Sequence, residues 1–484
     1  MKKLVLFFSM ILFAVIDVSA QNSVREEYEK FRQSLIKQYT SFRDECNEKY
    51  VDFLKQAWEY YQVAPVIPQP KEEEVPPVVI DEDTPKPIEE NELPYDEVVP
   101  VPDVEPQPQP IEPVKPQPVI IENWFEFQLF NTPFKIRADE SHKFALSSVD
   151  GNSVAEVWQK LMTNKYDNML IDCLNIREEY KLCDWAYLLM LITFSGEFLQ
   201  SENEMILLTA YLYSQSGYKM RLGIDNTGVV LLFGTKHQIY GLPYFDLDGE
   251  YYYPLNGGSE NMQIADFAFP NEKNMSLMVA EEPELARAQS EPRKLTAEGY
   301  KTVASCSVNT NLVEFFASFP SSQLDDNPLT RWAIYANTPL DSTIKEMLYP
   351  SLAATMDGKS YPEAADILLD FVQTAFVYEY DDKVWGGDRA FFAEESLYYP
   401  YCDCEDRSIL FSRLVRDLLG LKVILVYYPG HLATAVRFDE NVLGDYIDLN
   451  GDRYLVCDPT YIGAPIGATM PDMDNATATV ILLE

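Results

Sequence analysis

The sequence is poor in positive charge and in histidine. Its 484 residues include 38 Lys and Arg against 77 Asp and Glu, a formal net charge of −39, and only three His. A surface this acidic repels the phosphates of nucleic acids and of anionic lipids, so neither is expected as a partner. The simplest role of the acidity is solubility.

Cysteine and long apolar runs are also scarce. Seven cysteines, an odd number, allow disulfides in an oxidising compartment but leave at least one thiol unpaired, and the sequence does not assign the pairing. One apolar run lies within residues 1–20, between Lys2-Lys3 and the small residues Val18-Ser19-Ala20, which predicts a secretory signal peptide. The chain is therefore expected in the periplasm, on the cell surface or in the medium. No later run is long and apolar enough to cross a bilayer.

Two segments of contrasting composition follow. Between residues 21 and 62 apolar residues recur three or four apart with charges between them, which predicts one long amphipathic helix. Its apolar stripe is expected either to self-associate or to pack against the same chain. Residues 63–121 are rich in proline and acidic residues, a composition that does not bury a core, and they are expected to form an extended, partly polyproline, disordered linker.

The stretch from Tyr401 to Phe411 changes from a polar, cysteine-bearing run into an apolar helical pattern. The pattern continues to Gly420 and predicts an amphipathic helix closed by glycine. Cys404 would begin this helix, where unpaired N–H groups and the positive end of the dipole favour a thiolate. Cys402 is the rival nucleophile, but only Cys404 has the helix pattern in register, so Cys402 is expected to support the loop.

Two residues further along complete a set for nucleophilic catalysis. His431 opens a predicted strand after a Pro-Gly turn, and Asp458 follows the predicted strand 454–457. A thiolate, an imidazole that moves its proton and a carboxylate that holds the imidazole form the cysteine version of a catalytic triad. The alternatives are a cysteine and a histidine buried for structural reasons, and an Asp458 that only caps the turn at Pro459-Thr460.

These motifs resemble the transglutaminase-like branch of the papain-like superfamily. The resemblance rests on Cys404-Glu405-Asp406 before an apolar helix, Gly430-His431 on one strand and Cys457-Asp458-Pro459-Thr460 on the next. It covers roughly the last third of the chain. It implies an α+β fold with the nucleophile at the start of a helix packed on an antiparallel sheet, and acyl transfer through a thioester.

The same resemblance implies a role for each residue. Cys404 would be the nucleophile, His431 the general base and acid, and Asp458 the orienting group, with the Cys404 main-chain N–H as the first oxyanion donor. Trp385 would be the aromatic residue of the acyl site, and the alternative is a loop tryptophan that covers the core.

The string Asp403-Cys404-Glu405-Asp406 also resembles bacterial transglutaminase-like cysteine proteinases, in which acidic residues beside the nucleophile bind calcium. The resemblance implies a weak calcium site at Asp403, Glu405 and Asp406, and no other cofactor is expected. The simpler interpretation is that these carboxylates offset the helix dipole.

An earlier stretch repeats the pattern without its chemistry. Residues 201–208 align without gaps on residues 404–411, which lie 203 positions later, and residues 246–250 align on 448–452, which lie 202 positions later. Both of the latter stretches predict hairpins turned by Asp-Gly or Asn-Gly. Upstream, residues 143–146 resemble residues 331–334. We infer an internal duplication.

The first copy is expected to be catalytically inactive, because Ser201, Val229 and Asn256 stand where the second copy has Cys404, His431 and Asp458. His142 and His237 fall outside the matched position and are expected to be structural or surface residues.

The sequence thus predicts an α+β chain of tandem transglutaminase-like (papain-like) domains. The expected order is a signal peptide (1–20), an amphipathic helix (21–62), an acidic Pro-rich linker (63–121), a degenerate domain (122–257), a connector (258–304) and a catalytic domain (305–484). The expected function is an exported cysteine acyl-transfer enzyme acting on protein or peptide amides, including those of the cell envelope, with hydrolysis favoured over cross-linking. The alternative is a non-catalytic binding or scaffold protein at the cell surface.

Overall fold

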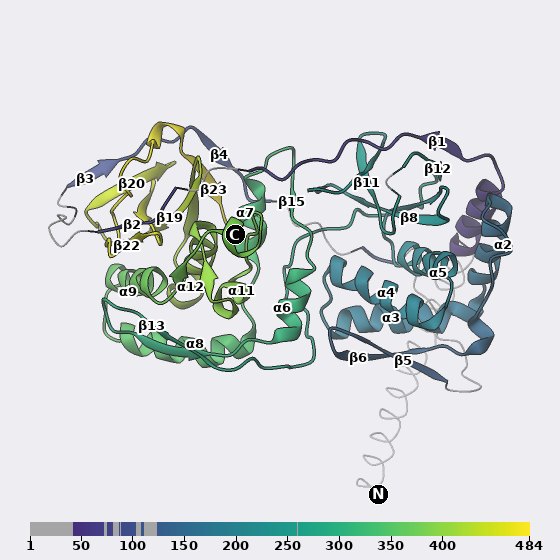
Figure 1. Cartoon of the computed structure of the whole chain (residues 1–484), viewed down its shortest axis with the longest axis horizontal. Helices are drawn as coiled ribbons and strands as arrows, with labels where there is room; N and C mark the ends of the chain where they lie inside the picture. The colour runs from purple at the N-terminus through teal and green to yellow at the C-terminus, as the bar shows by residue number, and fades with distance from the viewer. Residues whose placement is uncertain are drawn as a thin grey trace, which may run out of the picture.

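Two lobes lie side by side in the computed structural model, and each combines a curled sheet with helices (Figure 1). The structure describes residues 42–71, 75–80, 87, 89–102, 108–110, 123–258 and 260–484. In Figure 1 the sheet of each lobe lies above its helices, and a two-stranded hairpin lies below them. The chain is therefore of mixed α and β structure, as the sequence predicts.

The first lobe places a hairpin and four helices ahead of its sheet. The hairpin consists of β5 (Trp124–Leu129) and β6 (Thr132–Arg137). The helices are α2 (Gly151–Leu161), α3 (Asp167–Glu179), α4 (Asp184–Phe198) and α5 (Glu202–Gln215), with short 3-10 turns at Glu140–His142 and Asn164–Tyr166. The sheet strands are β7 (Met220–Ile224), β8 (Val229–Thr235), β10 (Phe245–Leu247), β11 (Glu250–Pro254) and β12 (Met262–Ala265), while β9 (Gln238–Ile239) pairs with β15 (Ser322–Gln323).

The second lobe repeats this plan at greater length. It begins with the hairpin β13 (Arg293–Thr296) and β14 (Val303–Cys306). Its helices are α6 (Thr310–Ala317), α7 (Thr330–Asn337), α8 (Ser342–Met356), α9 (Tyr361–Thr374), α10 (Asp381–Val384), α11 (Ala393–Tyr398) and α12 (Cys404–Leu419). The sheet strands are β18 (Val423–Tyr428), β19 (His431–Arg437), β20 (Gly444–Leu449), β21 (Asp452–Cys457) and β23 (Thr479–Leu482), joined by the short strands β16 (Val377–Tyr378), β17 (Tyr401–Cys402) and β22 (Tyr461–Ile462) and a 3-10 turn at Asn475–Thr477.

The two sheets have the same strand order. The first runs β10-β11-β8-β7-β12-β1, where β1 is Glu59–Tyr61. The second runs β20-β21-β19-β18-β23-β4, where β4 is Glu97–Val99, and β3 (Glu90–Glu92) is added beside β20. The predicted hairpins are present in both, turned at Asp248-Gly249 and at Asn450-Gly451, and all four of these residues have positive φ. The upstream match is weaker, because residues 331–334 lie in α7 whereas residues 143–146 form no helix.

The segment before the first lobe differs from its prediction. Residues 42–54 form a helix, but β1 (Glu59–Tyr61) is a strand, so the predicted helix 21–62 ends early; residues 1–41, which include the expected signal peptide, lie outside the described residues. The helix 42–54 packs on the first lobe, where Tyr50 and Leu54 join the core and the guanidinium of Arg43 donates to Asp167 at 2.8 Å. The stripe of this part is thus covered by the same chain.

The described parts of the expected linker 63–121 are not a free spacer. They form β2 (Val78–Val79), β3 (Glu90–Glu92) and β4 (Glu97–Val99), which pair with β22, β20 and β23 respectively. In Figure 1 this purple-to-blue segment runs along the top of the molecule from the first lobe to the second. Proline is tolerated next to short edge strands, and two adjacent β-branched residues are enough to form the hydrogen bonds of a short strand. The average composition of the segment therefore does not reveal these three strands.

The expected connector 258–304 also needs correction. It contains β12, which lies between β7 and β1 in the first sheet, as well as β13, which opens the second lobe. Short strands are expected in this region, but with four residues each they are too short for periodicity to show which sheet they join.

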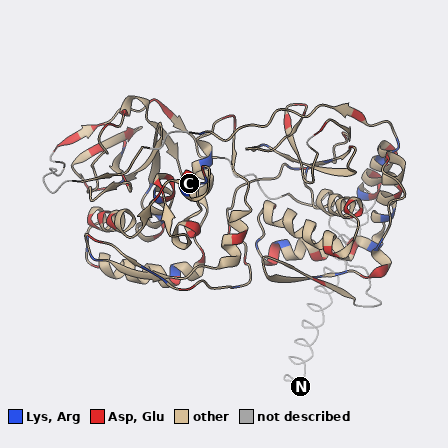
Figure 2. Cartoon of the chain, in the orientation of Figure 1, with Lys and Arg blue, Asp and Glu red and all other residues tan. Residues whose placement is uncertain are grey.

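Charge and hydropathy agree with the composition. Figure 2 shows Asp and Glu spread over the helices and strands of both lobes, with fewer Lys and Arg among them. Within the part of the chain that the structure describes, no helix is long and apolar enough to span a membrane.

Candidate active site

The helix α12 begins at Cys404 for local reasons. Asp403 precedes it as the N-cap with extended backbone, and its N–H donates to the Asp406 carboxylate at 3.3 Å. The helix ends as predicted at Gly420, whose φ of 66° is left-handed and costs glycine little. The Ser408 hydroxyl donates to the carbonyl of Leu432 at 2.7 Å and fixes the helix against β19.

His431 occupies the first position of β19. The strand is reached through a two-residue turn at Pro429-Gly430, where Gly430 has a φ of 79°. The opposite residue of the hairpin, Tyr428, places its ring 6.3 Å from the imidazole at an interplanar angle of 21°. The turn that the sequence predicts therefore delivers the histidine to the end of a central strand.

Asp458 directly follows β21 and holds the imidazole. Its Oδ2 lies 2.8 Å from Nε2 of His431, while its Oδ1 accepts the N–H of Thr460 at 2.8 Å. One carboxylate thus caps the turn and contacts the ring, so the two interpretations of this residue are not exclusive. Because a carboxylate only accepts hydrogen bonds, the neutral ring carries its proton on Nε2, which leaves Nδ1 as the basic nitrogen. Nδ1 is buried and has no hydrogen-bond partner among the described residues.

Further hydrogen bonds join α12 and α9 to the turn that carries Asp458. The buried guanidinium of Arg407 donates to the carbonyls of Gln373, Phe376 and Pro459. The amide of Gln373 donates to the carbonyl of Asp458 at 3.0 Å. Buried hydrogen bonds of this kind hold their members in one geometry, although Nε of Arg407 has no hydrogen-bond partner among the described residues.

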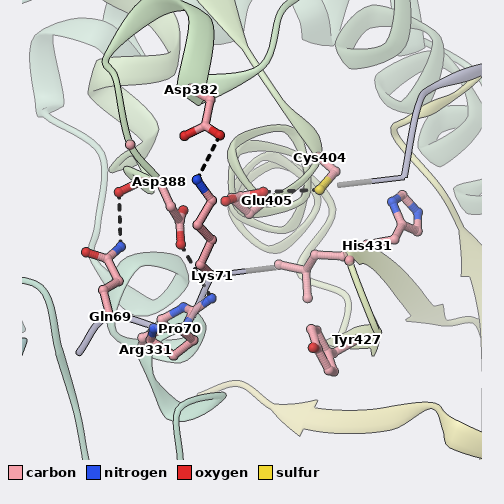
Figure 3. Close-up of a pocket in the computed structure, with 13 residues that line it drawn as sticks. Gln69, Pro70, Lys71, Arg331, Asp382, Asp388, Cys404, Glu405, Tyr427 and His431 are labelled. Atoms are coloured by element: carbon pink, nitrogen blue, oxygen red, sulfur yellow. Dashed lines mark hydrogen bonds and ion pairs between the residues drawn. The ribbon is translucent and has the colours of Figure 1, made fainter. Parts of the chain in front are cut away.

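Cys404 and His431 line one cavity of about 250 Å³. In Figure 3 the sulfur points toward Glu405, with the His431 ring on its other side. The remaining lining comes from distant parts of the chain: Gln69, Pro70, Lys71, Arg331, Asp382, Gly387, Asp388, Glu405, Tyr427, Gly430 and Leu432. The structure therefore brings the three predicted residues to one place, with Asp458 behind the histidine.

The thiol of Cys404 is held in its protonated form. It donates to the Glu405 carboxylate at 3.1 Å. Burial raises the pKa of Cys404 well above its usual value, and the charges of Glu405 and Asp403 raise it further, whereas the N–H of Leu432 acts in the opposite direction. Loss of water and the adjacent carboxylates therefore oppose the helix dipole, on which the expectation of a thiolate at the helix start rests.

Sequence reasoning missed several residues of the cavity. Burial raises the pKa of Asp388 to about 6, with a further rise from the charge of Glu405, and Arg331 lies 3.8 Å from the Asp388 carboxylate. Gln69 and Lys71 come from the segment that the sequence assigns to a linker. No local pattern distinguishes these residues, since they meet only in the fold.

Trp385 does not belong to the cavity. Its ring packs against Phe391 at 5.7 Å and Tyr399 at 4.8 Å between centroids, and the guanidinium of Arg389 lies 4.7 Å from its centre. The alternative, a loop tryptophan that covers the core, is the one that the structure supports. The aromatic residue at the cavity is instead Tyr427.

The three acidic residues proposed for calcium are divided between two groups. Asp403 and Asp406 lie with Asp381, whereas Glu405 lies with Asp381 and Asp388, and within each group one oxygen per residue comes within 4.8 Å of the others. Carboxylate oxygens are suitable calcium ligands. However, Asp406 already accepts the N–H groups of Phe391 and Asp403, and burial together with Asp381 and Glu405 raises its pKa well above the usual value. A retained proton accounts for this cluster as well as a cation would.

The other cysteines and histidines have structural surroundings. All seven cysteines lie among the described residues, and all are buried and free of disulfides. Cys402 lies in β17 outside the cavity, as predicted. Burial lowers the pKa of His237 to about 3, and its Nδ1 lies 3.1 Å from the Ser322 hydroxyl, while His142 lies 3.0 Å from Asp139.

The matched positions of the first lobe have equivalent places but no chemistry. Ser201 is the N-cap of α5, Val229 is the first residue of β8, and Asn256 follows β11. The side-chain amide of Asn256 donates to the carbonyl of Val229 at 3.2 Å, so a main-chain contact stands where the second lobe has the imidazole and carboxylate.

Comparison of the chain with protein-family models, with curated proteins and with solved structures finds no match.

Proposed function

We propose that this protein is a cysteine acyl-transfer enzyme of the transglutaminase-like type that acts on protein or peptide amides. The observation that carries the proposal is the contact of His431 with Asp458, which leaves a basic Nδ1 beside a cavity that also receives Cys404. A nucleophile, a base and a group that orients the base are the parts that this chemistry needs.

The protonated thiol defines the first step. Nδ1 of His431 takes the proton from Sγ of Cys404 as the sulfur attacks the amide carbonyl and forms a C–S bond. The C–N bond then breaks, and the amine leaves with the proton that the imidazole carried. Water or a second amine gives a proton to the imidazole as it attacks the thioester, the C–S bond breaks, and the imidazole passes this proton to the thiolate. The Cys404 main-chain N–H is the first candidate donor to the developing oxyanion.

The nucleophile that resolves the thioester decides the reaction class. Water makes the protein a protease or amidase, and an amine makes it a cross-linking enzyme. We favour hydrolysis, with proteins or peptides of the cell envelope as the substrate class. We also propose that the protein is exported, and this part of the proposal depends on the sequence of residues 1–20. The common strand order of the two sheets supports a duplication in which the first copy lost its catalytic residues.

Alkylation by iodoacetamide at pH 7.5, followed by peptide mapping, tests the proposal at Cys404 itself. Because His431 is the base, His431→Ala should slow the alkylation of Cys404 at least about 100-fold, given the usual contribution of a general base. Cys402→Ser is the matched control and should leave the rate unchanged. Equal rates in the wild type and in His431→Ala would contradict the proposal that the protein is a cysteine acyl-transfer enzyme.

A non-catalytic binding protein is the second candidate. It is favoured by the hydrogen bond of the Cys404 thiol to Glu405, which keeps the sulfur from the imidazole in this state. Under this interpretation the cavity binds a polypeptide without cleaving it. Cleavage of, or amine incorporation into, denatured cell-envelope proteins by the wild type but not by Cys404→Ser would reject this candidate.

A further inference from the structure

The segment that leads from β1 to β2 contacts both lobes. On the first lobe the N–H of Ala64 donates to the carbonyl of Tyr244 at 2.7 Å, and the N–H of Gly241 donates to the carbonyl of Ile67 at 2.9 Å. These are main-chain contacts of an extended segment. They bring the chain to the edge of the cavity that contains Cys404.

Residues 69–71 then form part of the wall of that cavity. The side-chain amide of Gln69 donates to the carbonyl of Asp388 at 3.0 Å, and the ammonium of Lys71 lies 3.1 Å from the Asp382 carboxylate. Figure 3 shows these side chains on the same side of the cavity as Asp382 and Asp388, across from the His431 ring. The chain thus fills space next to its own candidate nucleophile.

Residues 75–80 bind the opposite wall. The N–H of Val75 donates at 2.9 Å to the carbonyl of Gly430, the residue before His431. Val78 and Val79 pair in parallel with Tyr461 and Ile462 of β22, close to Asp458 in the sequence.

The same wall is apolar. The N–H of Ile80 donates to the carbonyl of Ile462 at 2.8 Å. The side chains of Val75, Val78 and Ile80 pack against a cluster of Tyr461, Ala464 and Met470. Main-chain pairing combined with pockets for alternate side chains is the usual way in which a protein binds an extended peptide.

We propose that the cavity and β22 form a binding site for an extended polypeptide, and that residues 69–71 and 75–80 occupy it as an intramolecular competitor. The inference rests on the proposed function in treating the displaced ligand as the substrate. It names the substrate class as an unfolded or extended segment of protein, aligned by its main chain between Asp388 and Gly430.

The main chain contributes more to this binding than the charge does. The side chains of Lys71 and Asp382 are 77% and 57% exposed, and an exposed ion pair changes an equilibrium constant by less than about fivefold. The hydrogen bonds at Gly430 and Ile462 join main-chain atoms, and the side chains of Val75 and Val78 are half-buried against the apolar cluster. The site is therefore expected to accept extended segments of varied sequence, with only a mild preference for a basic residue near Asp382.

The substitution Val75→Pro tests the inference, because it removes the N–H that binds Gly430 and retains an apolar side chain. Two reagents are compared at Cys404 by peptide mapping: iodoacetamide, which is small, and a chloroacetyl group on an extended ten-residue peptide. Alkylation by the peptide reagent should rise about fivefold in Val75→Pro, the factor expected for the loss of one hydrogen bond, and alkylation by iodoacetamide should rise less. Val66→Pro, in the same segment but outside the cavity, should leave both rates unchanged.

A synthetic peptide with the sequence of residues 63–80 provides the reverse experiment. Added to Val75→Pro, it should slow alkylation by the peptide reagent, whereas a scrambled peptide should not. The double variant Gln69→Ala/Lys71→Ala keeps the experiment decisive if Val75→Pro does not fold, because it removes only one partly buried hydrogen bond and one exposed ion pair and should also raise the rate.

The failure of this inference and the failure of the proposed function give different results. The rate of peptide alkylation could be unchanged in Val75→Pro and in the double variant and still depend on His431. That result would contradict the inference of an intramolecular competitor and would not affect the proposed function. A rate that rises in Val75→Pro but does not depend on His431 would support the polypeptide site and reject the catalysis.

Discussion

The start of a helix meets the start of a central strand in both lobes, but different atoms join them. In the first lobe the Asn203 side chain accepts the N–H of Val229 at 2.7 Å. In the second lobe the Ser408 hydroxyl donates to the carbonyl of Leu432, and the side chain at the start of the strand is free to bind Asp458. In the first junction the polar side chain binds the main chain, whereas in the second one imidazole nitrogen has no partner within the part of the chain that the structure describes. An unpaired buried polar atom is costly, and such a cost is usually retained where it serves function.

The largest expected effect comes from exchanging the orienting residue between the lobes. Asp458→Asn should lower the rate of Cys404 alkylation about 100-fold, because an amide that donates to the ring favours the wrong tautomer and removes the basic nitrogen. Asn256→Asp makes the opposite change at the matched position of the first lobe and should leave the rate within about twofold of the wild type. Peptide mapping after timed alkylation measures the rate in both variants. Equal effects of the two substitutions would contradict the prediction that only the second lobe orients a catalytic base.

The next effect concerns the carboxylate beside the thiol. Glu405→Gln removes a negative charge that raises the pKa of Cys404, although burial continues to raise it. The fraction of thiolate at pH 8 should therefore increase, and alkylation by iodoacetamide should accelerate up to about tenfold. A pH profile of the alkylation rate gives the pKa directly. Glu202→Gln, at the start of α5 in the first lobe, is the matched control, and a profile of Glu405→Gln identical to that of the wild type would contradict the prediction.

The acidic residues of the second lobe predict an unusual dependence of stability on pH. Burial raises the pKa of Asp388 to about 6 and that of Glu395 to about 7, from ordinary values of 3.8 and 4.5. Between about pH 4.5 and pH 7 the folded chain holds protons that the unfolded chain has lost, so the free energy of unfolding should rise as the pH falls through this window. Urea denaturation at pH 7.5 and pH 5.5 measures the change.

The variant Asp388→Asn/Glu395→Gln should weaken this dependence, since its amides do not titrate, while Asp406, whose pKa burial also raises, retains part of it. Asp382→Asn, which changes an exposed carboxylate, should preserve it. A wild-type protein that is no more stable at pH 5.5 than at pH 7.5 would show that these carboxyl groups are ionised in the folded state.

The smallest expected effect is on the two junctions themselves. Ser408→Ala and Asn203→Ala each remove one hydrogen bond between a helix and a strand and should lower the free energy of unfolding by about 1 kcal/mol. Only Ser408→Ala should also slow the alkylation of Cys404, because it loosens α12 against β19. A loss of reactivity in Asn203→Ala of the same size would mean that stability, and not the position of the helix, controls the thiol.

Local chemistry made part of the site predictable. A helix pattern that ends in glycine located Cys404, a Pro-Gly turn located His431, and the polar residue after a short strand located Asp458. The protonation of Cys404 was not predictable, because burial and the approach of Glu405 depend on how the whole lobe packs. Trp385 was misassigned for the same reason, since its partners Phe391 and Tyr399 are recognised only in three dimensions.

The fold shows a similar division. The hairpins at Asp248-Gly249 and Asn450-Gly451 follow from turn chemistry that operates over two residues, and both were predicted. The role of residues 63–121 was not, because a composition averaged over the segment conceals Val78-Val79 and Val98-Val99. These short pairs contact residues far along the chain, and periodicity, which is a local property of the sequence, does not detect such contacts.

The pairing of β1 with β12 and of β4 with β23 has a consequence for the biogenesis of the protein. Each sheet takes its last strand from a part of the chain that leaves the ribosome before the lobe it completes. Proteolysis or truncation ahead of residue 123 would remove β1 from the first sheet and both β3 and β4 from the second, and would expose the backbone of β12, β20 and β23. Exposed strand edges pair with one another, so a shortened protein should aggregate through these three strands even though each lobe retains its own hydrophobic core.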